Sequence, residues 1–169
     1  MEHDFQTVYL SAGSNLGDRF ANLMRGLRLL GSDGTQVRYV SSVFETEPLE
    51  AGGSPWFLNL AAELHTHLTP RELLARFQAI ENEAGRVRST PNAPRTLDLD
   101  ILLYDTLVID DPDLVVPHPR LHLRRFVLEP LAEIAPYAVH PVLHRTVRDL
   151  LDACEDSSEI RLYLPEVAP

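Results

Sequence analysis

Apolar residues along this chain either alternate with polar ones or recur every three to four positions, and the two periods predict different elements. Alternation of β-prone residues predicts strands at 7–13, 37–44, 57–67 and 97–104. Helical spacing of apolar residues predicts a helix that follows a turn and helix cap at 14–18 and runs to about residue 30, and further helices over 70–85, 126–134 and 147–154. We expect the last 15 or so residues to form a loosely ordered tail or an edge strand.

The order of the first six elements is strand, helix, strand, strand, helix, strand. This order predicts an α+β fold, a ferredoxin-like β-α-β-β-α-β sandwich with a mainly antiparallel sheet and C-terminal additions. The helices would pack on one face of the sheet, which leaves the other face free to bind a substrate. With no repeats and no low-complexity linker, residues 1–169 are expected to form a single domain.

Composition excludes several classes of function. All 15 basic residues are arginine, so neither a lysine-bearing phosphate loop nor Schiff-base chemistry is available. The net charge of −10 argues against binding to nucleic acid, which depends on many basic side chains. No apolar run is long enough to span a membrane, and we expect a cytoplasmic protein with no membrane partner.

Two carboxylates stand two residues apart in an apolar run. On an extended strand Asp98 and Asp100 would share one face, while Leu97, Leu99 and Ile101 would point into the core. Two acids this close in a half-buried site are costly unless a cation compensates them.

Arginines flank this pair of acids. Arg95 precedes the strand, and Arg86 and Arg88 lie in the loop before it. Anion-binding groups beside a cation-binding pair suit a nucleotide polyphosphate with its magnesium. The alternative is an ordinary half-exposed antiparallel strand, in which acids also alternate with Leu and Ile.

Five motifs, in order, give the chain a resemblance to the 6-hydroxymethyl-7,8-dihydropterin pyrophosphokinase family along nearly its whole length. They are Ala12-Gly13-Ser14-Asn15-Leu16-Gly17, Phe57-Leu58-Asn59, Ile80-Glu81 with Gly85-Arg86-Val87-Arg88, Pro94-Arg95-Thr96-Leu97-Asp98-Leu99-Asp100-Ile101, and Val116-Pro117-His118 with Arg124 and Phe126. The resemblance implies an enzyme of folate biosynthesis. It would transfer pyrophosphate from ATP to the hydroxymethyl oxygen of the pterin and release AMP.

The same resemblance assigns roles to particular residues. It implies catalytic roles for Arg86, Arg95, Asp98 and Asp100, with two Mg²⁺ ions held by Asp98 and Asp100. The ATP site would be lined by Gln78, Glu81, Arg88, Ile101, His118 and Arg124. The pterin would be bound by Thr46, Pro48, Leu49, Phe57, Asn59 and Phe126.

Several of these residues have a purely structural alternative. Gln78 and Glu81 fit a solvated helix face. His118 would cap a turn between its two prolines, whereas a zinc site shared with His122 is disfavoured because Pro119 spoils the helical spacing. The aromatic rings at positions 57 and 126 would be plain core packing.

Two other functions fit the same sequence. A noncatalytic sensor of nucleotide or pterin would use the same fold without turnover. A nucleotidyl transferase would also need two acids on a strand, but it would release pyrophosphate in place of AMP. For each we expect small-molecule ligands and a monomeric protein.

Overall fold

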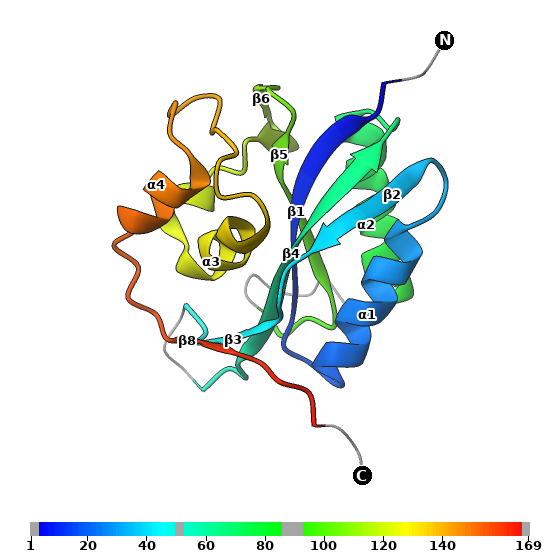
Figure 1. The fold of residues 1–169 in the computed structure, drawn as a ribbon. Helices are drawn as coiled ribbons and strands as arrows, with labels where there is room; N and C mark the ends of the chain where they lie inside the picture. The colour runs from blue at the N-terminus through cyan, green and yellow to red at the C-terminus, as the bar shows by residue number, and fades with distance from the viewer. Residues whose placement is uncertain (1–3, 50–52, 86–92, 167–169) are drawn as a thin grey trace.

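The computed structural model describes residues 4–49, 53–85 and 93–166, and its centre is an antiparallel sheet (Figure 1). The strands run in the order β5-β1-β4-β3-β8, and β2 also pairs with β4. Their bounds are β1 Gln6–Ser14, β2 Thr35–Val40, β3 Phe44–Thr46, β4 Phe57–Thr66, β5 Asp98–Tyr104 and β8 Ile160–Leu162. The predicted mixture of helices with an antiparallel sheet is confirmed.

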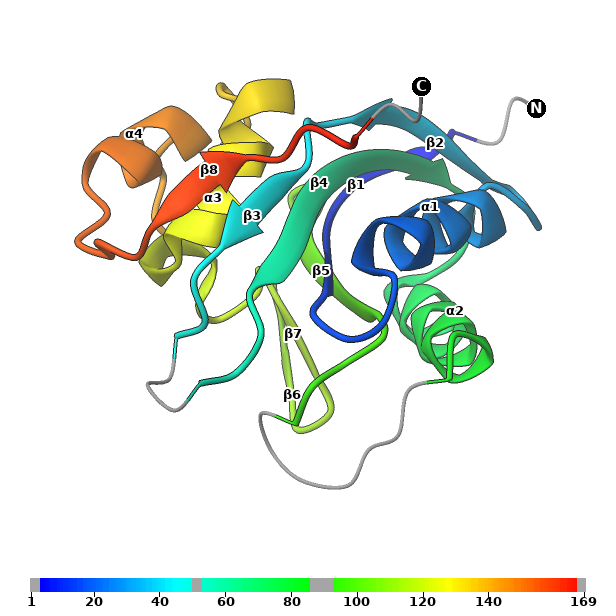
Figure 2. The ribbon, with the colours of Figure 1, turned by 90° about the horizontal axis from the view of Figure 1, so that it is seen from below.

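Two helices, α1 (Arg19–Leu30) and α2 (Pro70–Glu83), cover one face of this sheet (Figure 2). Alternate residues of β1 and β4, among them Leu10 and Leu60, point toward them and are fully buried. Asp18 accepts a hydrogen bond from the Ala21 amide and so fixes the start of α1. This cap lies within the turn and helix cap predicted at 14–18, and Leu16 before it is exposed.

The opposite face of the sheet is not wholly free, contrary to our expectation. Helices α3 (Arg125–Ile134) and α4 (Val147–Asp152) pack there in a second apolar cluster that includes Ala61 of β4 (Figure 1). A short 3₁₀ turn, η1 (Leu121–Leu123), precedes α3. The part of this face that remains open lies at the C-terminal end of β1 and the N-terminal ends of β4 and β5. The site described below is found there.

The predicted strand 37–44 is interrupted. Ser41 and Ser42 lie in the break between β2 and β3. The side chains of both residues form hydrogen bonds with other parts of the chain. The Ser41 hydroxyl accepts the Ala61 amide at 2.9 Å. The amide and hydroxyl of Ser42 both donate to Glu133 of α3, at 2.6 and 2.8 Å. A polar link from the sheet to α3 thus replaces regular pairing.

Part of the C-terminal segment forms a strand at the edge of the sheet. Strand β8 pairs antiparallel with β3, and the Tyr163 amide donates to the Val43 carbonyl at 2.8 Å. The Tyr163 ring also packs near Phe20 of α1. The alternative expectation, an edge strand, is confirmed.

A hairpin of β6 (Ile109–Asp111) and β7 (Leu114–Val116) projects beside β5 (Figure 2). Arg71 at the start of α2 reaches this hairpin and pairs with Asp111 at 2.6 Å and with Asp113 at 2.8 Å. In the described ranges the helices are all too short or too polar to cross a membrane.

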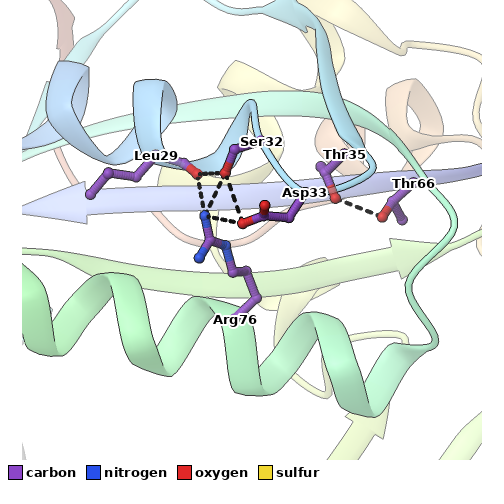
Figure 3. Close-up of polar contacts among 6 residues, drawn as sticks. All are labelled: Leu29, Ser32, Asp33, Thr35, Thr66 and Arg76. Atoms are coloured by element: carbon purple, nitrogen blue, oxygen red, sulfur yellow. Dashed lines mark hydrogen bonds and ion pairs between the residues drawn. The ribbon is translucent and has the colours of Figure 1, made fainter.

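The two helices on the first face are linked by a polar cluster far from the open end of the sheet (Figure 3). Arg76 of α2 donates to the Leu29 carbonyl at the C-terminus of α1 and to the Ser32 hydroxyl, and it pairs with Asp33 at 3.2 Å. A guanidinium at this end of a helix satisfies a free carbonyl and complements the helix dipole.

Candidate active site

Three residues lie in one row across the central strands. In the register of the sheet, Gly13 of β1 stands opposite Asp98 of β5 on one side and opposite Asn59 of β4 on the other. Two residues earlier, Ser11 stands opposite Asp100. Because neighbouring strands are spaced about 4.8 Å apart, the backbones at Asp98 and Asn59, at the two ends of this row, are separated by roughly 10 Å.

Gly13 makes room for Asn59. A Cβ atom at position 13 would lie 2.5 Å from the Asn59 Oδ1 atom, which is closer than real Cβ contacts come. The amide nitrogen of Asn59 donates to the Thr46 hydroxyl at 2.6 Å, and both side chains are buried. Asn59 is therefore held in one orientation by a close backbone approach and a hydrogen bond.

Arg95 is fixed from two directions. Its amide donates to the Asn15 side-chain oxygen at 2.7 Å, and its carbonyl accepts the Asn15 amide at 3.0 Å. Its guanidinium donates to Asp98 Oδ2 at 2.5 Å. The end of β1 thus holds the loop before β5 and places a cation beside the first acid.

The second acid is more deeply buried. Burial raises the pKa of Asp100 to about 7, and the nearby negative charges of Asp98 and Glu81 act in the same direction, whereas Arg124 and Arg95 oppose them. Glu81 is itself buried, and its carboxylate accepts the Leu99 amide at 2.8 Å, between the two acids of the strand. A cation bound at Asp98 and Asp100 would oppose this rise in the pKa of Asp100.

These side chains surround one pocket on the open part of the sheet. Asp98 and Asp100 both line it, so the prediction that they share a face is confirmed, and Leu97, Leu99 and Ile101 are buried in the core as expected. The full lining is Ser11, Gly13, Asn15, Thr46, Glu47, Pro48, Leu49, Ser54, Phe57, Asn59, Ala93, Arg95, Asp98, Asp100, Arg124 and Phe126.

Comparison with known sequences identifies the family. A family described as 7,8-dihydro-6-hydroxymethylpterin-pyrophosphokinase (HPPK) matches residues 9–136. The chain belongs to the HPPK family. The 2-amino-4-hydroxy-6-hydroxymethyldihydropteridine pyrophosphokinase of Bacillus subtilis is 48% identical to it over 128 residues, which are 75% of this chain and 77% of that protein. The protein of the same name from Pseudomonas aeruginosa is 42% identical over 150 residues, covering 88% and 92% of the two chains.

Other HPPK relatives are much longer. Folic acid synthesis protein fol1 of Schizosaccharomyces pombe is 41% identical over 157 residues, which are 92% of this chain but 21% of that protein. The chain spans about a fifth of the length of this relative and of those from Dictyostelium discoideum and Pneumocystis carinii.

Solved HPPK structures share the fold. The HPPK-DHPS A437G protein of Plasmodium falciparum with STZ-DHP has a TM-score of 0.73 at 14% identity, and the match covers 90% of this chain and 46% of that one. The wild-type protein with STZ-DHP has a TM-score of 0.72 at 17% identity, over 90% and 44% of the two chains. The family resemblance that the motifs predicted is confirmed, and the prediction of an enzyme agrees with the names of the relatives.

The HPPK pocket brings together most, but not all, of the residues singled out in the sequence. All six residues predicted to bind the pterin line it, as do Arg95, Asp98, Asp100 and Arg124. The rings of Phe57 and Phe126 are half-buried and border the pocket, so they are not plain core residues. Arg86 and Arg88 lie outside the described residues.

Four residues predicted to line the ATP site of this HPPK-family chain do not border the pocket. Ile101 is buried in the core, and Gln78 is exposed on α2. The alternative of a solvated helix face therefore holds for Gln78 but is wrong for Glu81, which is 2% exposed.

His118, the fourth, caps a turn. Its Nδ1 accepts the Arg120 amide at 3.1 Å, which agrees with the structural alternative. Burial lowers the pKa of His118 to about 4, with smaller contributions from Arg124 and Arg120, so this imidazole is neutral at pH 7. Across residues 4–49, 53–85 and 93–166, no three His, Cys, Asp or Glu side chains gather where they could hold a metal, and the His118–His122 zinc alternative gains no support.

Several residues that line the pocket were not predicted from the sequence. Ser11 and Gly13 could have been found by alternation along β1, because they face the same side of the sheet as the two acids. Asn15 was named only as part of the first motif, and its contact with Arg95 spans 80 residues. Glu47 and Ser54 sit at the two ends of the long loop after β3, and no local pattern marks them.

Proposed function

We propose that this chain transfers pyrophosphate from ATP to the hydroxymethyl group of 6-hydroxymethyl-7,8-dihydropterin, giving the pterin diphosphate and AMP. One observation carries the proposal: a single pocket has two acids and Arg95 at one end and a buried amide at the other, and Arg124 and two aromatic rings also line it. The name of the family and those of its relatives point in the same direction.

The reaction needs no protein nucleophile. The hydroxymethyl oxygen forms a bond to the β-phosphorus of ATP, and the bond from that phosphorus to the oxygen bridging to the α-phosphate breaks, so AMP leaves. Catalysis then consists of alignment and charge stabilisation. Arg95, already oriented by Asn15 and Asp98, is well placed to neutralise phosphate charge at the acid end of the pocket.

The residues at the acid end fit Mg²⁺. Asp98 and Asp100 supply hard carboxylate oxygens on one face of β5, and burial, followed by the negative charges of Asp98 and Glu81, raises the pKa of Asp100. Magnesium keeps several water ligands and binds through one or two carboxylates with substrate phosphates, so two acids suffice. We propose that these two residues hold two Mg²⁺ ions, whose chemistry is to neutralise charge on the phosphate oxygens.

The other end of the pocket suits a flat heterocycle. The Asn59 amide is held by Thr46 and can read an edge of donors and acceptors. Phe57 and Phe126 offer aromatic faces for stacking. Pro48 and Leu49 complete the proposed pterin site on the loop side.

The remaining assignments are part of the same proposal. We keep the assignment of ATP binding to Gln78, Glu81, Arg88, Ile101, His118 and Arg124, although Gln78, Glu81, Ile101 and His118 lie outside the pocket lining, and we assign a phosphate-binding role to Arg86. The strand order supports a ferredoxin-like description of the core, in which β5, β1, β4 and β2 are the four strands of the β-α-β-β-α-β unit. We expect a monomer that acts in the cytoplasm.

Product analysis tests this function. The purified chain is incubated with ATP, MgCl₂ and 6-hydroxymethyl-7,8-dihydropterin, and nucleotides and pterins are separated by chromatography. We expect AMP and pterin diphosphate in equal amounts, and no AMP when the pterin is omitted. Release of inorganic pyrophosphate would indicate a nucleotidyl transferase, and binding of both ligands without turnover would indicate a sensor. Either outcome would overturn the proposal.

A further inference from the structure

The segment 156–161, which runs from beyond α4 into β8, contacts two opposite walls of the pocket without lining it. We infer that this segment positions the two walls relative to each other and thereby sets the affinity for the pterin. The inference rests on the proposed function. Figures 1 and 2 show the segment leaving α4 and running along the edge of the sheet beside β3.

The first wall is the start of α3. The N-cap residue, Arg124, makes no side-chain capping bond, but Asp156 Oδ2 accepts the Arg125 amide at 2.9 Å and so caps the helix from another part of the chain. Asp156 is held in turn by the amide and hydroxyl of Ser158. Burial opposes ionisation, but the bonds from Ser158 and Arg125 outweigh it and lower the pKa of Asp156. The helix turn fixed in this way carries Arg124 and Phe126, which both line the pocket.

The second wall is the end of β3 and the loop that follows. Ile160 of β8 stands opposite Thr46 in the sheet register. One residue further, the Glu47 amide donates to the Glu159 carbonyl at 3.0 Å, and the Glu159 amide donates to the Glu47 carboxylate at 2.9 Å. Thr46 and Glu47 both line the pocket, so the segment holds the start of the long loop.

The other end of the same loop is also held. The Arg161 guanidinium lies over the Trp56 ring, 4.3 Å from its centroid, and Arg161 pairs with Glu159 at 3.4 Å. The Trp56 carbonyl accepts a hydrogen bond from Arg19 at 2.9 Å. Trp56 directly precedes Phe57, which lines the pocket, so these contacts restrain the position of that ring.

Together these contacts fix the spacing between Phe126 on one wall and Phe57 on the other. A slot that takes a flat ring depends on that spacing, because binding weakens when the walls must first be ordered. The acid end of the pocket is held by other contacts, those of Asn15 with Arg95 and of β1 with β5. Loosening the contacts with the second wall should therefore weaken pterin binding more than ATP binding, whereas loosening the start of α3 also releases Arg124 and should weaken both.

The experiment uses two variants that break separate contacts, Asp156→Ala and Arg161→Met. Each has a matched control: Glu155→Ala removes a neighbouring exposed acid, and Arg148→Met removes an exposed arginine of α4. Pterin affinity is measured by fluorescence titration with Mg²⁺ and a nonhydrolysable ATP analogue present, and KM for ATP and the thermal midpoint are measured alongside. Because Arg161 is exposed, its replacement leaves the core intact.

We expect each variant to raise the pterin Kd by roughly three- to tenfold, as loss of a cap or a cation–π contact does. KM for ATP should change by a smaller factor in Arg161→Met and should rise in Asp156→Ala, which also releases Arg124. Both controls should match the wild type. Asp156→Asn, which keeps one acceptor oxygen, should lie between wild type and Asp156→Ala. An unchanged pterin Kd in both variants would overturn the inference. So would equal losses for pterin and ATP in Arg161→Met that follow the thermal midpoint, because they would mean a purely structural role. Failure of the wild type itself to bind pterin would instead contradict the proposed function.

Discussion

The side-chain oxygen of Asn59 occupies the space that a Cβ atom would need at Gly13, with only 2.5 Å between the two positions. This close approach lets the amide of one strand lie over the backbone of the next. The relationship makes glycine at position 13 a requirement of the pocket and gives a direct test of the proposed pterin site.

Gly13→Ala should push Asn59 away and break its bond to Thr46. We expect the pterin Kd to rise by roughly tenfold or more and the free energy of unfolding to fall by about 1–3 kcal/mol, as overpacking does. Fluorescence titration and urea unfolding measure the two effects. The control is Gly31→Ala, since a Cβ there meets only ordinary contacts at 3.7 and 3.9 Å. Normal pterin affinity in Gly13→Ala would refute the assigned role of Asn59.

The two strand acids should be needed for turnover but not for folding. Asp98→Asn and Asp100→Asn keep size and hydrogen-bonding capacity while removing the charge that would hold Mg²⁺. We expect each to reduce the rate of AMP formation by about a hundredfold or more, in line with loss of a group that stabilises transition-state charge. The exposed Asp110 of β6 provides the control, Asp110→Asn. Circular dichroism should show all three variants folded.

Asp100 should also make stability depend on pH. Its pKa lies near 7 in the folded chain and at 3.8 when unperturbed, so the unfolded state loses its proton first as the pH rises. The contribution of Asp100 to the stability of the folded state is fully present below about pH 4. It is lost progressively as the pH rises to about 7, because the folded state holds the proton that the unfolded state has released. In EDTA, Asp100→Asn should be more stable than wild type at pH 8, by on the order of 2 to 4 kcal/mol, and the difference should shrink at pH 5. Urea unfolding at the two pH values measures it, and a constant difference would contradict the assignment.

The cluster around Arg76 should affect stability alone. Arg76→Met removes the bonds to the Leu29 carbonyl and to Ser32 that join α2 to the end of α1 (Figure 3). We expect the free energy of unfolding to fall by about 1–3 kcal/mol, with KM for both substrates unchanged. Arg148→Met on the surface of α4 is the matched control. A change in KM would mean that the helix pair also shapes the pocket.

Local patterns predicted the features that depend on neighbours in sequence. Alternation alone placed Asp98 and Asp100 on one face and Leu99 in the core, because strand geometry fixes which way each side chain points. The capping box at Thr69 and Glu72 likewise marked the start of α2 at Pro70.

Features that depend on distant partners were not predictable in this way. Strand β8 has three residues and no buried side chain. It forms by pairing with the edge of β3, which lies more than 110 residues earlier in the chain. The contact of Asn15 with Arg95 was not predicted, because Arg95 comes from another loop. The break at Ser41 arises from contacts with β4, which the run of β-prone residues does not reveal.

The central claim is that the carboxylates of Asp98 and Asp100 form a divalent-cation site for the bound nucleotide. The most direct measurement is a Mn²⁺ titration followed by water proton relaxation, with the protein saturated by a nonhydrolysable ATP analogue. We predict two protein-bound ions in the wild type and loss of enhancement in the Asp98→Asn/Asp100→Asn double variant, with nucleotide binding checked independently. Equal uptake by the wild type and the double variant would contradict the account.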